Sequence, residues 1–190
     1  MKKMFLLFFI MFAFITTVSA YKFNIDYWVI QARGGVGYPV LDSGNHLNLG
    51  FSGGISVRKG FDTELSGGGG ISYVNMGYKI AGAPGPFTAT VLQLEGVYAP
   101  YLPNLFVWPY LKAGLGMWMV KYANLSAVEP SQLSAQSTFG FQLGIGASYP
   151  INNVFAANVE AMFNQASISG GTGDIYNFIT FCAGVTMLLK

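Results

Sequence analysis

Apolar and polar side chains alternate with a period of two in eight stretches of the chain. In the clearest stretch, 138–149, Phe139 and Ile145 fall on one face, and Gln142 and Ser148 fall on the other. A period of two is the signature of a β-strand, because successive side chains of a strand point to opposite faces. The strands predicted in this way are 28–38, 46–57, 63–74, 89–99, 108–120, 138–149, 154–164 and 178–189.

The connections between these strands alternate in length. The longer segments are 39–45, 75–88, 121–136 and 165–175, and the shorter ones are 58–62, 101–106 and 150–153. Long and short connections therefore lie at opposite ends of the strands. This arrangement predicts an all-β fold, an eight-stranded antiparallel up-and-down transmembrane β-barrel with short periplasmic turns and longer outer loops.

The polarity of the two faces decides between a membrane barrel and a soluble one. A soluble sandwich or barrel also alternates, but its interior is apolar. Here one face carries large apolar groups, whereas the other mixes charges, amides, hydroxyls and glycines that could not form a dry core. Charged residues make up only 9% of the chain, against about a quarter in typical soluble domains. We therefore expect the apolar face to contact lipid and the polar face to line the interior.

The aromatic residues support this orientation, because amphipathic rings favour the two membrane interfaces. The predicted register places two aromatic girdles on the barrel. The girdle near one rim contains Trp28, Tyr98, Tyr149 and Phe155, and the girdle near the other contains Tyr38, Tyr73, Phe139 and Phe163. The alternative interpretation is a scatter of aromatic residues through a β-rich sequence.

Five charged residues share the predicted interior face: Arg33, Glu64, Glu95, Lys112 and Glu160. An eight-stranded barrel is just wide enough for side chains to fill it, so these charges need partners. A hairpin centred between Pro103 and Asn104 places Glu95 opposite Lys112, which predicts an ion pair. The favoured interpretation of this barrel-interior charge cluster is a polar plug, and the alternative is a gate whose pairs exchange to admit small ions.

The first twenty residues have the features of a secretory signal peptide. Lys2 and Lys3 precede an apolar run, and Val18-Ser19-Ala20 supplies the small residues of a cleavage site. The run is shorter than the roughly 20 residues of a spanning helix, which disfavours a retained anchor. We expect a cleaved signal peptide at 1–20 and a barrel domain at 21–190.

The remaining charges and the rare reactive residues narrow the function classes. Two of the ten basic residues lie in the signal peptide, so eight basic residues balance eight acidic ones and nucleic-acid binding is not expected. The chain has one cysteine, Cys182, and one histidine, His46. These counts predict neither a metal site nor a cofactor.

The stretch Gly50 to Gly54 matches the G-x-S-x-G pattern of hydrolases, with Ser52 at its centre. A nucleophile elbow needs a strand-to-helix turn and a later histidine, whereas Ser52 lies inside a predicted strand and follows His46. We therefore expect no enzyme activity. A less favoured alternative is an outer-leaflet lipid hydrolase that uses Asp42, Ser43 and His46 near the outer rim.

Two segments, VYAPYLPNLFVWPYLKAGLGM and the closing FCAGVTMLL, resemble the small OmpA/OmpX-like eight-stranded outer-membrane β-barrel protein family over residues 21–190. This resemblance implies a monomer in the bacterial outer membrane, in contact with outer-membrane lipid and lipopolysaccharide. It also implies that the barrel-assembly machinery reads the last strand at Gly184, Met187 and Leu189. The expected function is non-enzymatic, with an envelope-structural role or the binding of an unidentified surface ligand, and the alternative is a narrow ion-conducting pore.

Overall fold

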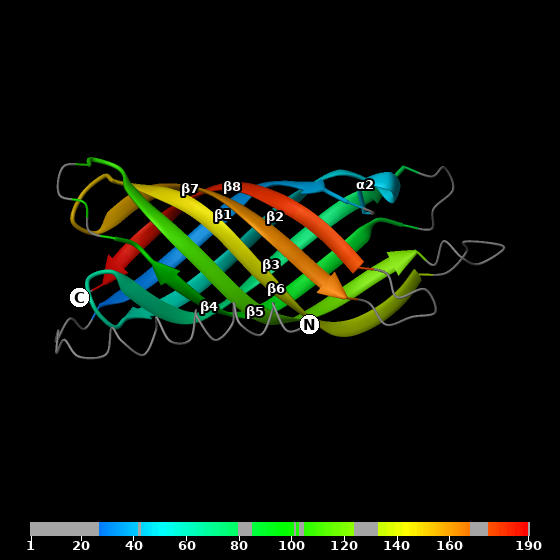
Figure 1. Cartoon of the computed structure of the whole chain (residues 1–190), viewed down its shortest axis with the longest axis horizontal. Helices are drawn as coiled ribbons and strands as arrows, with labels where there is room; N and C mark the ends of the chain where they lie inside the picture. The colour runs from blue at the N-terminus through cyan, green and yellow to red at the C-terminus, as the bar shows by residue number, and fades with distance from the viewer. Residues whose placement is uncertain are drawn as a thin grey trace, which may run out of the picture.

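Eight antiparallel strands close into a barrel in the computed structural model of the chain (Figure 1). Each strand pairs with the next along the chain, and β1 pairs with β8 to close the sheet. The structure describes residues 27–41, 43–79, 85–100, 102, 105–123, 133–167 and 175–189, so the expected signal peptide lies outside the described residues.

All eight predicted strands are confirmed. Their observed bounds are β1 (Trp28–Pro39), β2 (Leu47–Gly60), β3 (Leu65–Tyr78), β4 (Phe87–Tyr98), β5 (Trp108–Ala123), β6 (Leu133–Pro150), β7 (Phe155–Ser167) and β8 (Ile175–Leu189). β6 begins five residues before the predicted start, at Leu133, and there it remains paired with β5 as far as Ala123. Polar residues occupy both faces there, so the two-residue period fades although backbone pairing continues.

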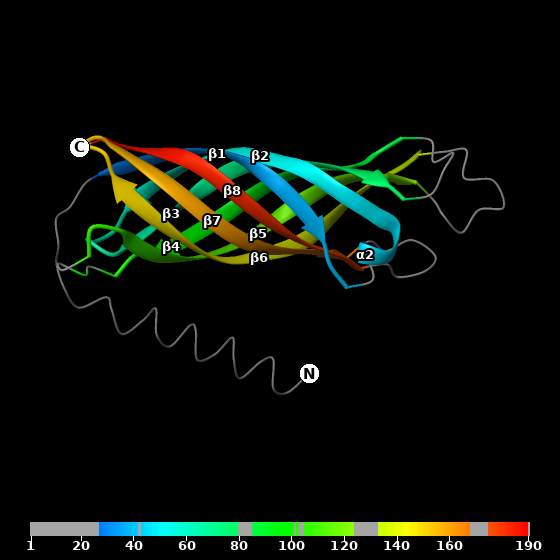
Figure 2. The same cartoon turned by 90° about the horizontal axis from the view of Figure 1, so that it is seen from above.

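The two ends of the barrel differ. The C-terminal end of β8 lies at one end, and the four-residue helix α2 (Ser43–His46) lies at the other (Figures 1 and 2). We call these the turn end and the loop end. Among the described residues, no helix is long and apolar enough to cross a membrane.

Two of the turn-end connections share the same turn chemistry. The Oδ1 atom of Asp62 accepts hydrogen bonds from the backbone N–H groups of Glu64 and Leu65. The Oδ1 atom of Asn152 accepts the equivalent bonds from Val154 and Phe155. Such side-chain bonds satisfy the turn backbone and fix where the next strand begins. The third connection, 99–107, is longer than the predicted short turn at 101–106.

The outer surface of the barrel is apolar, as predicted. Leu94 and Phe139 are 74% and 81% exposed, and many other large apolar side chains of the strands are also exposed. A hydrocarbon environment is compatible with such a surface, because the closed sheet pairs its backbone groups internally.

The register places a boundary of this apolar band near the loop end. Ile71, Leu92, Met117 and Phe139 form one outward row across four strands. Four residues nearer the loop end on each strand, the corresponding row contains Asn75, Thr88, Lys121 and Ala135. Such a change from apolar to polar side chains is expected where acyl chains give way to headgroups.

We expect Leu94→Arg to lower the free energy of unfolding by about 2–4 kcal/mol, because Leu94 points outward within the apolar band. Thr88→Arg is the matched control on the same strand, and it should cost no more than about 1 kcal/mol because it lies in the polar row. Urea titration of the folded protein in lipid vesicles measures both effects. Equal losses would contradict this placement of the membrane.

The structure places all eight predicted girdle residues on outward positions. The exposed residues Trp28, Tyr98 and Tyr149, together with Phe155, occupy the turn-end parts of their strands. Tyr38, Tyr73, Phe139 and the half-buried Phe163 occupy the loop-end halves of theirs. Their role at the membrane interfaces stays a prediction.

Leu47 departs from the predicted pattern. The sequence places it on the lipid face with Leu49 and Phe51, but Leu47 is only 1% exposed and lies in the interior. The β2–β3 register shifts between Leu47 and Gly50, which is a β-bulge. An extra residue in one strand reverses the faces of the residues beyond it, so Leu47 turns inward.

Candidate functional site

The interior charges in the turn-end half of the barrel form one continuous chain of ion pairs. Arg58 Nη1 lies 3.4 Å from Glu95 Oε1, and Lys112 Nζ lies 3.0 Å from Glu95 Oε2. Lys112 Nζ also lies 3.7 Å from Glu160 Oε2, and Arg33 Nη1 lies 2.7 Å from Glu160 Oε1. The side chains are at most 8% exposed. Lys112 therefore connects two carboxylates, each of which also forms an ion pair with an arginine.

The predicted ion pair between Glu95 and Lys112 is present, but the register that predicted it is wrong. Glu95 pairs with Gly114, and Lys112 pairs with Val97. The connection between β4 and β5 is longer than a tight hairpin, which moves the register by two residues. The predicted centre of the hairpin lies outside the described residues. The two side chains are diagonal neighbours, and the long lysine stem spans the offset.

Neutral donors hold both carboxylates in place. Gln93 Nε2 donates to Glu95 Oε2 at 2.6 Å. Tyr110 Oη and Gln31 Nε2 donate to Glu160 Oε2 at 3.1 Å and 3.3 Å. Hydrogen bonds to buried carboxylates offset part of the cost of removing them from water.

Glycines on the intervening strands make room for these contacts. Gly68 pairs with Arg58 on one side and with Glu95 on the other, so the two side chains meet above it. A Cβ atom at Gly68 would overlap the backbone of Val57 and Arg58. A Cβ atom at Gly146 would overlap the ring of Tyr110. The inward glycines are thus part of the charge site, because they allow large side chains to cross a narrow lumen.

The observed charge cluster differs from the predicted one at two residues, Glu64 and Arg58. Glu64 lies in the turn before β3, half-buried at the turn end, where its carboxylate accepts a hydrogen bond from Tyr98. Glu64 lies outside the ion-pair chain because the turn that Asp62 holds extends to Leu65, so Glu64 belongs to the turn and not to the strand. Arg58 was missed because the predicted strand stopped at Val57. Continuing the alternation of Ser52 and Ser56 by one step would have found it.

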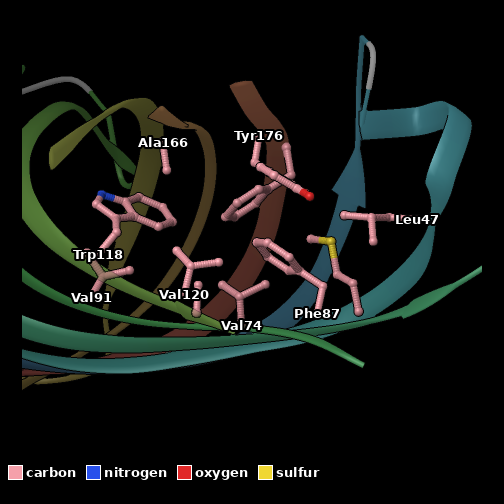
Figure 3. Close-up of a cluster of buried hydrophobic side chains, with 11 residues drawn as sticks. Leu47, Val74, Phe87, Val91, Trp118, Val120, Ala166 and Tyr176 are labelled. Carbon is pink, nitrogen blue, oxygen red and sulfur yellow. The ribbon is translucent and has the colours of Figure 1, made fainter. Parts of the chain in front are cut away.

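The loop-end half of the interior is mainly apolar, although Asn164 and Thr180 are also buried there, and this corrects the prediction of a polar interior throughout. We call the apolar group the apolar plug. It consists of Leu47, Val74, Met76, Phe87, Ala89, Val91, Trp118, Val120, Ala166, Tyr176 and Phe178. Figure 3 shows the labelled members gathered inside the barrel. Trp118 packs edge-on against Phe178 with ring centroids 5.6 Å apart, and Phe87 stacks on Tyr176 at 4.8 Å. The prediction failed because it assumed that the inward face of every strand is polar along its whole length.

The candidate hydrolase residues have structural contacts. Ser43 Oγ accepts a hydrogen bond from the Asn177 backbone at 2.9 Å and donates to the Ile175 carbonyl at 3.4 Å. His46 is exposed, and Asp42 lies outside the described residues. Ser52 is buried within β2, and its hydroxyl lies 3.3 Å from the Cys182 thiol. Within the described ranges, no three His, Cys, Asp or Glu side chains form a group that could hold a metal ion.

Comparisons with known proteins agree with this architecture. The model of the outer membrane protein beta-barrel domain family matches residues 10–187. Neisserial surface protein A superposes with a TM-score of 0.57 at 17% identity, covering 86% of this chain and 96% of that one.

Two further solved barrels are similar. The N-terminal barrel domain of Pseudomonas aeruginosa OprF has a TM-score of 0.54 at 16% identity, covering 86% of this chain and 97% of that one. Ail from Yersinia pestis has a TM-score of 0.53 at 14% identity, covering 86% and 98%. No curated protein sequence matches the chain. At these identities the likeness concerns the fold alone.

Proposed function

Because the chain belongs to the outer membrane protein beta-barrel domain family of the bacterial outer membrane, we propose that it is a closed, non-enzymatic barrel with an envelope-structural or surface-binding role. In this proposal the barrel holds its outer loops at the cell surface and does not conduct ions. The loops are the elements that a surface ligand would meet.

The observation that supports a closed barrel is the presence of two different obstructions along one narrow lumen. The ion-pair chain crosses the turn-end half, and the apolar plug fills the loop-end half. A hydrated ion would have to separate buried ion pairs and then pass an apolar constriction around Trp118. Both steps are costly, because charges are poorly solvated by apolar side chains.

The partners in this proposal follow from the location of the barrel in the outer membrane. The outward row that contains Lys121 meets lipopolysaccharide headgroups, and the apolar band meets acyl chains. Residues 1–20 direct export and are then removed. The last strand, β8, engages the barrel-assembly machinery during insertion, and the mature protein works as a monomer.

Planar-bilayer recording tests the closed barrel. We expect no discrete conductance from the wild type or from Lys112→Ala, because the apolar plug remains when the ion-pair chain is cut. A porin reconstituted at the same protein-to-lipid ratio is the positive control. Discrete channels in the wild type would overturn the proposal.

The second candidate function is a narrow ion-conducting pore. The position of Lys112 between Glu95 and Glu160, at 3.0 Å and 3.7 Å, favours it, because the lysine can exchange partners by a small movement. Channels that appear only in Lys112→Ala would support such a gate. Lipid hydrolysis has less support, because the hydroxyl of Ser43 already bonds to the backbone. Lipid hydrolysis by the purified protein, if it is lost in His46→Ala, would support the hydrolase alternative.

A further inference from the structure

The ion-pair chain carries a surplus positive charge. Three cationic side chains, Arg33, Arg58 and Lys112, face two carboxylates, Glu95 and Glu160. Five such side chains, each at most 8% exposed, have little water to solvate the unbalanced charge. A buried net charge is unfavourable unless a counter-ion or a change of protonation compensates it.

The donors of Arg58 are only partly used. Arg58 is 5% exposed, and its Nε and Nη1 atoms make no hydrogen bond to the described residues. Its contact with Glu95 is a single one at 3.4 Å, which is longer than an ordinary charge-assisted hydrogen bond. A guanidinium has five N–H donors and accepts nothing, so the remaining donors require an acceptor.

Arg58 lines a cavity, although its Nε and Nη1 atoms have no accessible surface of their own. The cavity has a volume of about 350 Å³, and we call it the turn-end cavity. Arg58, Gln31 and Tyr110 line it next to the ion-pair chain, and Glu64 and Pro100 line it at the turn end. A water molecule occupies about 30 Å³ in the liquid, so the space accommodates a small ion together with several waters.

We propose that the turn-end cavity binds one small monovalent inorganic anion, of the size and charge of chloride, on the Arg58 guanidinium. One negative charge balances the surplus of one positive charge in the ion-pair chain. Tyr110 and Gln31 also line the cavity, but their donors already bond to Glu160, so Arg58 is the group that would hold the anion. The carboxylate of Glu64 lines the cavity and that of Glu95 lies beyond Arg58, so both disfavour anions of higher charge. This site does not depend on whether the barrel conducts ions.

The test is the ³⁵Cl NMR linewidth of sodium chloride in the presence of the folded protein in a zwitterionic detergent. We expect excess broadening with the wild type and at least a severalfold reduction of it with Arg58→Gln. Lys59→Gln is the matched control, because Lys59 is the next residue on β2, points outward and carries the same charge. Broadening should persist in that control. Heat-modifiable gel migration confirms that each variant is folded.

A second variant covers the case in which Arg58→Gln does not fold. Ser66→Leu adds bulk to the lining of the turn-end cavity and leaves all five charges in place. It should remove the excess broadening as well. No excess broadening with the wild type would overturn the proposal, and the surplus charge would then be balanced by loss of a proton. Equal losses in Lys59→Gln and Arg58→Gln would also overturn it, because the chloride would then be an adventitious ion only.

Discussion

Glu95→Gln is expected to lower the free energy of unfolding by about 3–5 kcal/mol. The carboxylate of Glu95 lies between the cationic groups of Arg58 and Lys112, at 3.4 Å and 3.0 Å. A neutral amide would leave three buried cations with one remaining carboxylate, Glu160, which Lys112 and Arg33 already share. Urea titration in vesicles of fixed lipid composition, followed by tryptophan fluorescence and gel migration, measures the loss.

Glu64→Gln is the matched control for this prediction. The same chemical change at the half-buried turn should alter the free energy of unfolding by less than about 1 kcal/mol. An amide at this position can still accept the hydrogen bond from Tyr98. Losses of the same size at Glu64 and Glu95 would show that burial within the ion-pair chain does not set the cost.

Trp118→Ala should have a comparable effect, with a loss of about 3–5 kcal/mol. The indole is fully buried in the apolar plug and packs on Phe178. The surrounding strands are fixed by hydrogen bonds on both sides, so the interior cannot collapse to fill the space. The same urea titration measures the change.

Met117→Ala provides the comparison, because Met117 is the preceding residue on β5 and faces outward. Lipid can occupy the volume that its side chain leaves, so this change should cost clearly less than Trp118→Ala. Equal costs would mean that the two residues do not face opposite environments. Trp118→Phe should retain most of the stability.

The strands were predictable because the outward face of each is apolar over most of its length. An apolar outward face produces a period of two along each strand, and this period identified all eight strands. The prediction failed at Leu47, where a bulge inverted the faces, and at the loop-end parts of β5 and β6, where polar residues such as Lys121 and Gln136 interrupt the apolar period. Register shifts depend on pairing between strands, which the period of a single strand does not report.

The charge site was predictable only in part. A closed barrel gathers inward side chains into one lumen, so Arg33, Glu95, Lys112 and Glu160 could be grouped without knowing the register. Membership at the strand ends depended on the turn at Asp62, which excluded Glu64 from the ion-pair chain. The apolar plug was missed because its members come from strands whose heights in the barrel are set by the stagger between them.

The unequal filling of the two halves gives the lumen a direction. With the turn end in the periplasm, as proposed, small periplasmic solutes would approach the buried ions from the side of the turn-end cavity, whereas solutes outside the cell would first meet the apolar plug. In that orientation the ion-pair chain would exchange small ions with the periplasm, and the apolar plug would separate it from the medium outside the cell.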